Sequence, residues 1–125
     1  MRNFCFRGKT FSGRWVYGSL AYEDGVPAIF ESTNADGAAI VVKERTIGLN
    51  TGTKDKSGKE IFEGDIVQLK MIPEYYEVIW NDEIAAFTLR SVNEKSSQNW
   101  CETSPLGRTV KYYPAIIVGN IHDSN

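Results

Sequence analysis

Short apolar stretches, separated by polar turns, recur along almost the whole chain and restrict the folds it can adopt. Aromatic and β-branched residues dominate the stretches 14–22, 27–33, 65–72, 75–81, 85–92 and 110–121. Apolar residues with helical spacing are scarce. Segment 35–46 contains Gly37 and three consecutive β-branched residues, so a strand is the better prediction there. A weak helical signal lies around 96–102. Short strands spaced roughly every 8 to 12 residues predict a mainly β barrel or sandwich.

The strands can be assigned to two regions and, in part, to faces. Asp24-Gly25 predicts a hairpin turn between stretches 14–22 and 27–33. We place a soft boundary near Arg45, with a hairpin-rich region at 1–45 and a compact small barrel at 46–125. Alternation within each strand puts Val67 and Leu69 on one face of 65–72, Tyr76, Val78 and Trp80 on one face of 75–81, and Phe87 and Leu89 on one face of 85–92. We expect Trp80 and one tyrosine of each adjacent pair, 75/76 and 112/113, to lie in the core.

Composition argues against several classes of function. The 125 residues carry a net charge of −2 and a pI near 5.4, whereas broad phosphate-backbone binding needs a basic excess. Cys5 and Cys101 form no C-x-x-C pair and are expected to be reduced thiols. His122 stands alone, which disfavours a catalytic triad or a histidine metal site. No signal-like or membrane-length apolar stretch occurs, so we expect a cytoplasmic protein without a membrane partner.

Segment 51–70, TGTKDKSGKEIFEGDIVQLK, concentrates glycines and charges. Asp55 to Gly58 fits a type I turn, in which the Asp55 carboxylate accepts from an amide two residues on. At Glu63-Gly64-Asp65, glycine suits a sharp turn with positive φ, and Asp65 can bind the freed amides. The alternative is an ion site or acid–base pair made by Asp55, Glu63 and Asp65, which the interleaved lysines disfavour. We therefore expect structural turns here, with no catalytic residue, metal or cofactor.

A candidate binding surface combines cations with aromatic side chains. Its members are Arg7, Lys9, Arg14, Trp15, Tyr17 and Trp100. If the aromatic residues cluster with the cations, they could bind nucleic acid or an acidic peptide. If they cluster without charge, a homo-oligomer interface is the better interpretation.

The segment TIGLNTGTKDKSGKEIFEGDIVQL resembles the signature of the YopX family, which bacteriophages and prophages encode. The matching positions are Thr46, Ile47, Gly48, Thr51, Gly52, Asp55, Gly58, Ile61, Phe62, Glu63, Gly64, Asp65, Ile66 and Val67. FRGKTFSGRWVYGSL at 6–20 and VGNIHD at 118–123 are similar to the family's opening and closing motifs. The resemblance implies a mostly β fold with an SH3-like C-terminal barrel, and it implies no activity and no catalytic residues.

Three hypotheses about function follow. The first is a non-enzymatic phage or prophage accessory protein, located in the cytoplasm of the bacterial host, that binds an unknown protein or its own copies. The second is a nucleic-acid-binding small barrel in phage DNA metabolism or regulation, which requires an exposed basic patch. The third is an enzyme, which requires Glu63 or Asp65 to point into a pocket beside another polar group.

Overall fold

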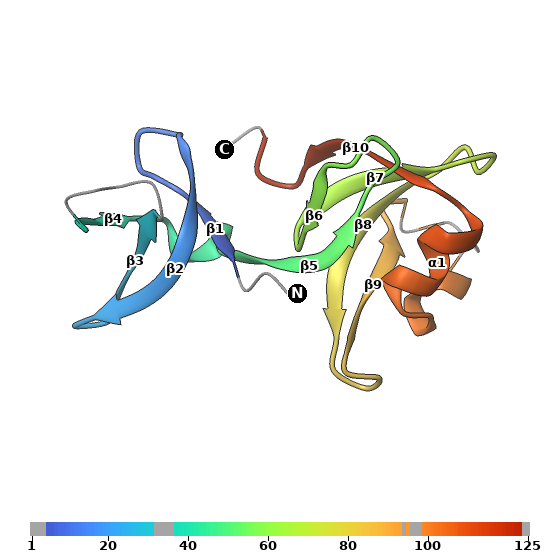
Figure 1. The fold of residues 1–125 in the computed structure, drawn as a ribbon. Coiled ribbons are helices and arrows are strands. Elements are labelled where there is room, and N and C mark those ends of the chain that lie inside the picture. Colours follow the sequence, from blue (N-terminus) through green and yellow to red (C-terminus); the bar gives the residue numbers. More distant parts are fainter. Residues whose placement is uncertain (1–4, 32–36, 94, 96–98, 124–125) are drawn as a thin grey trace. The chain divides into compact units, whose positions relative to one another are not determined.

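The computed structural model describes residues 5–31, 37–93, 95 and 99–123 and divides the chain after Asn50 into two compact units (Figure 1). The described residues are mainly β, as predicted. They form a six-stranded sheet in the order β4-β3-β2-β1-β5-β6 and a four-stranded sheet in the order β10-β7-β8-β9. In the order of their strands neither sheet closes on itself within this described part, so the predicted SH3-like barrel is not confirmed.

The first unit is an antiparallel sheet with a small core. Its elements are β1 (Phe6–Lys9), β2 (Trp15–Glu23), β3 (Val26–Glu31), β4 (Ala39–Val41), the 3-10 turn η1 (Glu44–Thr46) and the start of β5 (Gly48–Lys54). The predicted hairpin is confirmed: β2 and β3 pair antiparallel, and Asp24 and Gly25 both have positive φ, 52° and 79°, as a type I′ turn requires. Val16, Ile29 and Val42 form the buried core.

Gly18 shows how closely β2 and β3 approach each other. A Cβ atom at this position would lie 2.0 Å from the carbonyl oxygen of Phe30, which is far inside contact distance. Glycine is therefore required in the middle of β2, despite its usual cost in a strand interior.

The second unit packs five strands, one 3-10 turn and one short α-helix around one core. It contains β6 (Glu60–Phe62), β7 (Asp65–Leu69), β8 (Tyr75–Asn81), β9 (Ala86–Ser91), η2 (Trp100–Thr103), α1 (Leu106–Tyr112) and β10 (Ala115–Asn120), and β6 pairs with β5. The buried core consists of Ile61, Val67, Leu69, Tyr76, Val78, Leu89, Cys101, Leu106 and Ala115. Alternation therefore placed Val67, Leu69, Tyr76 and Val78 correctly.

Three of the sequence predictions in this unit are wrong. The strand predicted at 110–121 is β10 only from Ala115 onward, because α1 occupies its first residues; Leu106 and Val110, one helical turn apart, both pack on the core. Trp80 is 45% exposed, since it lies at the end of β8 beside the β8–β9 turn, where its indole N–H donates to Asp82 Oδ1 at 2.6 Å. Both tyrosines of the pair at 112/113 are exposed.

Two weaker expectations are partly met. Within 35–46 the strand is limited to β4, and η1 follows it. The helical signal around 96–102 corresponds to η2, although residues 96–98 lie outside the described part. In the residues that the structure describes, no helix has the length and apolar character needed to span a bilayer.

Candidate functional site

The outer face of the first sheet is an exposed apolar surface. Because side chains alternate along a strand, Tyr17 of β2 points away from the core residue Val16. On the same face lie Phe30 and Val26 of β3 and Val41 of β4. Their exposed fractions are 45% for Tyr17, 40% for Phe30, 45% for Val26 and 46% for Val41. We call the outward residues of β2, β3 and β4 the outer face.

Strand register makes the outer face continuous. Two rows cross the three strands, Ser19–Phe30–Ala39 and Ala21–Ala28–Val41. At the hairpin end, Val26 lies opposite Glu23, which is the one carboxylate among the described outward positions of β2 to β4. The solvent-facing side of an antiparallel sheet is normally polar. The outer face departs from this pattern, because most of its side chains are apolar.

The cations predicted for binding lie on β1, which pairs with β2 beside the outer face, and they contact an aromatic ring there. Lys9 lies opposite Trp15 and Arg7 opposite Tyr17. The Arg7 guanidinium carbon is 4.6 Å from the centroid of the Trp15 ring, and Lys9 Nζ is 5.8 Å from it. Arg7 and Lys9 are each only 6% exposed. In these cation–π contacts the two cations and the Trp15 ring bind each other instead of an external ligand.

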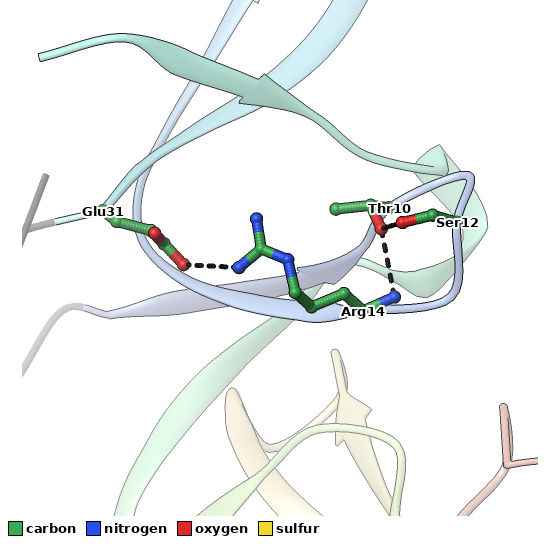
Figure 2. A network of polar contacts seen from close by, with 4 residues as sticks. All are labelled: Thr10, Ser12, Arg14 and Glu31. Atoms are coloured by element: carbon green, nitrogen blue, oxygen red, sulfur yellow. Dashed lines mark hydrogen bonds and ion pairs between the residues drawn. The ribbon is translucent and has the colours of Figure 1, made fainter. Parts of the chain in front are cut away.

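Arg14 belongs to a separate polar network (Figure 2). Its backbone N–H donates to Thr10 Oγ1 at 3.0 Å, and the Thr10 and Ser12 hydroxyls lie 2.9 Å apart. The guanidinium pairs with Glu31 at 3.5 Å, and its side chain is 60% exposed. An exposed pair of this kind contributes little to stability. The ion pair with Glu31 nevertheless reduces the positive charge that Arg14 could offer to an anionic ligand.

Trp100, the remaining member of the predicted surface, belongs to the second unit. It lies in η2 and packs against Tyr113, with the ring centroids 5.3 Å apart. Both rings are 40% exposed. Of the six residues predicted as a binding surface, the structure therefore brings Arg7, Lys9, Trp15 and Tyr17 together on two paired strands.

The Asp55 turn is held by the Asp55 carboxylate. Oδ1 accepts hydrogen bonds from the Ser57 amide at 2.9 Å, the Ser57 hydroxyl at 2.7 Å and the Lys59 amide at 2.9 Å. Gly58, with φ of 90°, donates its amide to the Asp55 carbonyl oxygen at 3.0 Å. The contact two residues on is the one that the sequence predicts.

The same turn also binds the outer edge of β10. Asp55 Oδ2 accepts from the Ile117 amide at 3.2 Å, and the Lys56 amide donates to the Ala115 carbonyl oxygen at 2.8 Å. Burial is the largest single influence on the pKa of Asp55 and raises it. The hydrogen bonds from Ser57, Lys59 and Ile117 together outweigh burial and hold this pKa below 3.8. The carboxylate therefore stays ionised at neutral pH in a structural role.

The turn at Glu63-Gly64-Asp65 connects β6 to β7 and is bound to β8 and to the residue after β10. Gly64 has φ of 94°; its amide donates to the Val78 carbonyl oxygen and its own carbonyl accepts from Ile121, both at 2.9 Å. Asp65 is 2% exposed, and its Oδ2 accepts from the Phe62 amide at 2.8 Å. Glu63 is half-buried. Among the described residues, no three or more histidines, cysteines and carboxylates are grouped as a metal ion would need.

Two titratable groups in the core of the second unit are strongly shifted. Burial, with smaller contributions from the nearby Cys101 and Glu74, raises the pKa of Tyr76 to about 12. Burial also raises the pKa of Cys101 to about 11, and its thiol lies 3.3 Å from the Leu89 carbonyl oxygen. Both groups are neutral at pH 7, and the neutral thiol is a weak nucleophile.

The outer-face residues other than Trp15 and Tyr17 were missed at the sequence level. Val26 to Phe30 form an uninterrupted apolar run, VPAIF, in a strand of an antiparallel sheet. A strand that is apolar at consecutive positions has two apolar faces, so both of its faces are expected to be covered. This run was the available signal for a binding surface on β3.

Comparison with known proteins identifies the family. The family described as YopX protein matches residues 9–125. The search among curated proteins returned no match. Because the match spans nearly the whole chain, it includes the outer face, the Asp55 turn and the Glu63-Gly64-Asp65 turn. The protein belongs to the YopX family.

Proposed function

We propose that this YopX-family protein is a phage- or prophage-encoded accessory protein of the host cytoplasm that acts by binding, without catalysing a reaction or using a cofactor. The outer face is its binding surface, and the partner is a protein: another copy of the chain or a different protein. The observation that carries the proposal is the set of four large apolar side chains on three neighbouring strands, each at least 40% exposed. Burying them in an interface would be favourable.

The state of the cations supports a protein partner over a nucleic acid. A nucleic-acid surface needs exposed lysines and arginines that can reach phosphates. Arg7 and Lys9 are each 6% exposed and contact Trp15, while Arg14 is opposite Glu31. Apart from Ser19 and Glu23, the outward positions of β2 to β4 carry apolar or aromatic side chains, which is the character of a protein–protein interface core.

The relation of the second unit to SH3-like barrels is part of the same proposal. The support for it is the arrangement of short antiparallel strands, with α1 before the last strand, around a single core. In this proposal the first unit carries the outer face that binds the partner, and the second unit is the SH3-like domain of the same protein.

The experiment compares the wild type with Phe30→Glu and Val41→Glu, each of which places a charge in the outer face. Tyr112→Glu is the matched control, since Tyr112 is 66% exposed and belongs to the second unit. Circular dichroism verifies folding, sedimentation velocity measures self-association, and affinity capture from infected host cells, with and without nuclease, identifies partners.

We expect Phe30→Glu and Val41→Glu to abolish self-association or the nuclease-resistant capture of a protein, while Tyr112→Glu leaves both intact. A capture that disappears on nuclease treatment would contradict a protein partner. If both outer-face variants retained the wild-type oligomeric state and the same captured proteins, the outer face would not be the binding surface.

A further inference from the structure

A second surface feature, independent of the outer face, is a groove of about 600 Å³ in the second unit. Its walls come from the end of β7, the segment that follows it, the start of β10 and the Asp55 turn. The lining residues that matter here are Lys56, Gln68, Lys70, Met71, Pro114 and Ile116. Ile116 lies opposite Gln68 in the β10–β7 pair and is 40% exposed.

Two lysines are anchored at this groove by their backbones. The Lys70 amide donates to the Pro114 carbonyl oxygen at 2.9 Å, and the Lys56 amide donates to the next carbonyl oxygen, that of Ala115, at 2.8 Å. Two segments far apart in sequence are thus attached to consecutive peptide groups. Both lysines are exposed. Because their backbones are fixed on neighbouring peptide groups, both side chains extend from the wall of the same groove.

The charge of the groove is opposite to that of its surroundings. Residues 51–124 contain eight lysines and arginines against eleven aspartates and glutamates. The residues that line the groove include two lysines and no carboxylate. The nearest carboxylate in sequence, Glu74, borders an adjoining hollow, and the Tyr76 hydroxyl lies 3.3 Å from it. A positive groove on an acidic unit favours an anionic ligand.

Met71 adds an exposed apolar side chain in a conformation that few residues adopt. Its φ is 69°, in the left-handed region, and it is 90% exposed. A bulky residue rarely takes this backbone conformation, and such strain is found at ligand-binding sites more often than elsewhere. Methionine side chains adapt to differently shaped apolar partners. The groove therefore offers a ligand the apolar side chains of Met71 and Ile116 in addition to two lysines.

We propose that this groove binds an extended peptide segment of a partner protein in which acidic side chains flank an apolar one. The carboxylates contact Lys56 and Lys70, and the apolar side chain packs against Met71 and Ile116. An amphiphilic anion of this kind matches both the charge and the apolar lining of the groove. The Asp55 turn has a role in this arrangement, because the hydrogen bond from the Lys56 amide to Ala115 of β10 fixes the backbone of one of the two lysines at the groove.

The test uses a fluorescein-labelled hexapeptide of alternating glutamate and leucine, with two comparison probes in which glutamine or lysine replaces glutamate. Fluorescence polarisation measures affinity, and amide shift changes in the NMR spectrum locate the probe. We expect the glutamate probe to bind about tenfold more tightly than the glutamine probe, with an affinity that falls as salt increases, and the lysine probe not to bind.

The double variant K56E/K70E should lose about tenfold or more in affinity, and Lys111→Glu, a single charge reversal on α1, should lose none. Met71→Gly removes the side chain and suits a positive φ, so it should weaken binding while the protein stays at least as stable to urea. Equal affinity for the glutamate and glutamine probes, shift changes away from the groove, or an unaffected K56E/K70E would overturn the proposal. None of these outcomes bears on the outer face, whose variants are tested separately.

Discussion

Removing the Asp55 carboxylate should destabilise the second unit more than any other single change in the Asp55 turn. Asp55 is 7% exposed and accepts four hydrogen bonds, three of them within its own turn and one from Ile117. Asp55→Ala deletes all four. Asp55→Asn retains one carbonyl oxygen but presents an N–H₂ donor where the Ile117 amide needs an acceptor.

The expected cost follows from these contacts. A hydrogen bond to a charged group contributes about 1.5–3 kcal/mol. Ser57 and Lys59 are exposed, so water can replace the carboxylate for their donors, whereas the Ile117 amide is half-buried within the β10 edge. Counting the Ile117 bond in full and the others as largely replaced, we expect Asp55→Ala to cost about 3 kcal/mol and Asp55→Asn about 2 kcal/mol.

The cost should also depend on pH. The pKa of Asp55 in the folded protein lies below its ordinary value of 3.8. A lowered folded-state pKa contributes stability above the unfolded-state pKa, and this stability is lost as the pH falls through the folded-state value. The gap between the wild type and Asp55→Asn should therefore be complete at pH 7 and should shrink below about pH 3.8.

Urea titrations of the wild type and both variants at pH 7 and at a series of acidic pH values measure these differences. Hydrogen exchange at the Ile117 amide reports the local effect and should accelerate in both variants. If Asp55→Asn were as stable as the wild type at pH 7, or if its deficit stayed constant down to pH 3, the carboxylate would not hold the turn in the way described.

Three further predictions concern other residues of the chain. Gly64→Ala should lower the free energy of unfolding by about 1 kcal/mol or more, because φ is 94° there; an unchanged melting temperature would contradict this reasoning. Thr88 is fully buried, and its hydroxyl has no hydrogen-bond partner in the described structure. Thr88→Val should therefore raise the unfolding free energy by about 1 kcal/mol in urea titration, whereas a loss would reveal a partner for the hydroxyl. Because burial raises the pKa of Cys101 to about 11, a disulfide reagent at pH 8 should modify the half-buried Cys5 first and Cys101 only after denaturation, and equal rates in the native protein would refute this.

Local chemistry made part of the fold predictable. The Asp24-Gly25 hairpin follows from two residues that tolerate positive φ, and Tyr76 and Val78 follow from simple alternation. The short helix α1 could not be found this way, because it is only seven residues long and depends on core contacts of Leu106 and Val110. Alternation also gives no information on where a core ends along a strand, which is why Trp80 was misplaced.

The candidate sites divide in the same way. The contact of Asp55 with the Ser57 amide is a local preference of aspartate in turns and was predictable. Its contact with Ile117, 62 residues away, depends on the tertiary fold. The anchoring of Lys56 and Lys70 on consecutive carbonyl groups is likewise a product of topology. The outer face was partly predictable. The run VPAIF indicates a strand with two apolar faces, but the neighbours of that strand depend on the tertiary fold.

The attachment of the Asp55 turn to β10 has a consequence for the behaviour of the protein at high concentration. Strand β10 lies at the end of its sheet and contains AIIV, an uncharged run of high β-propensity. An open edge of this composition is a template for pairing with strands of other molecules, and it can seed fibrils. By occupying the Ala115 carbonyl and the Ile117 amide, the turn keeps these groups from intermolecular pairing. We therefore expect variants that release the Asp55 turn from β10 to aggregate at lower protein concentrations than the wild type.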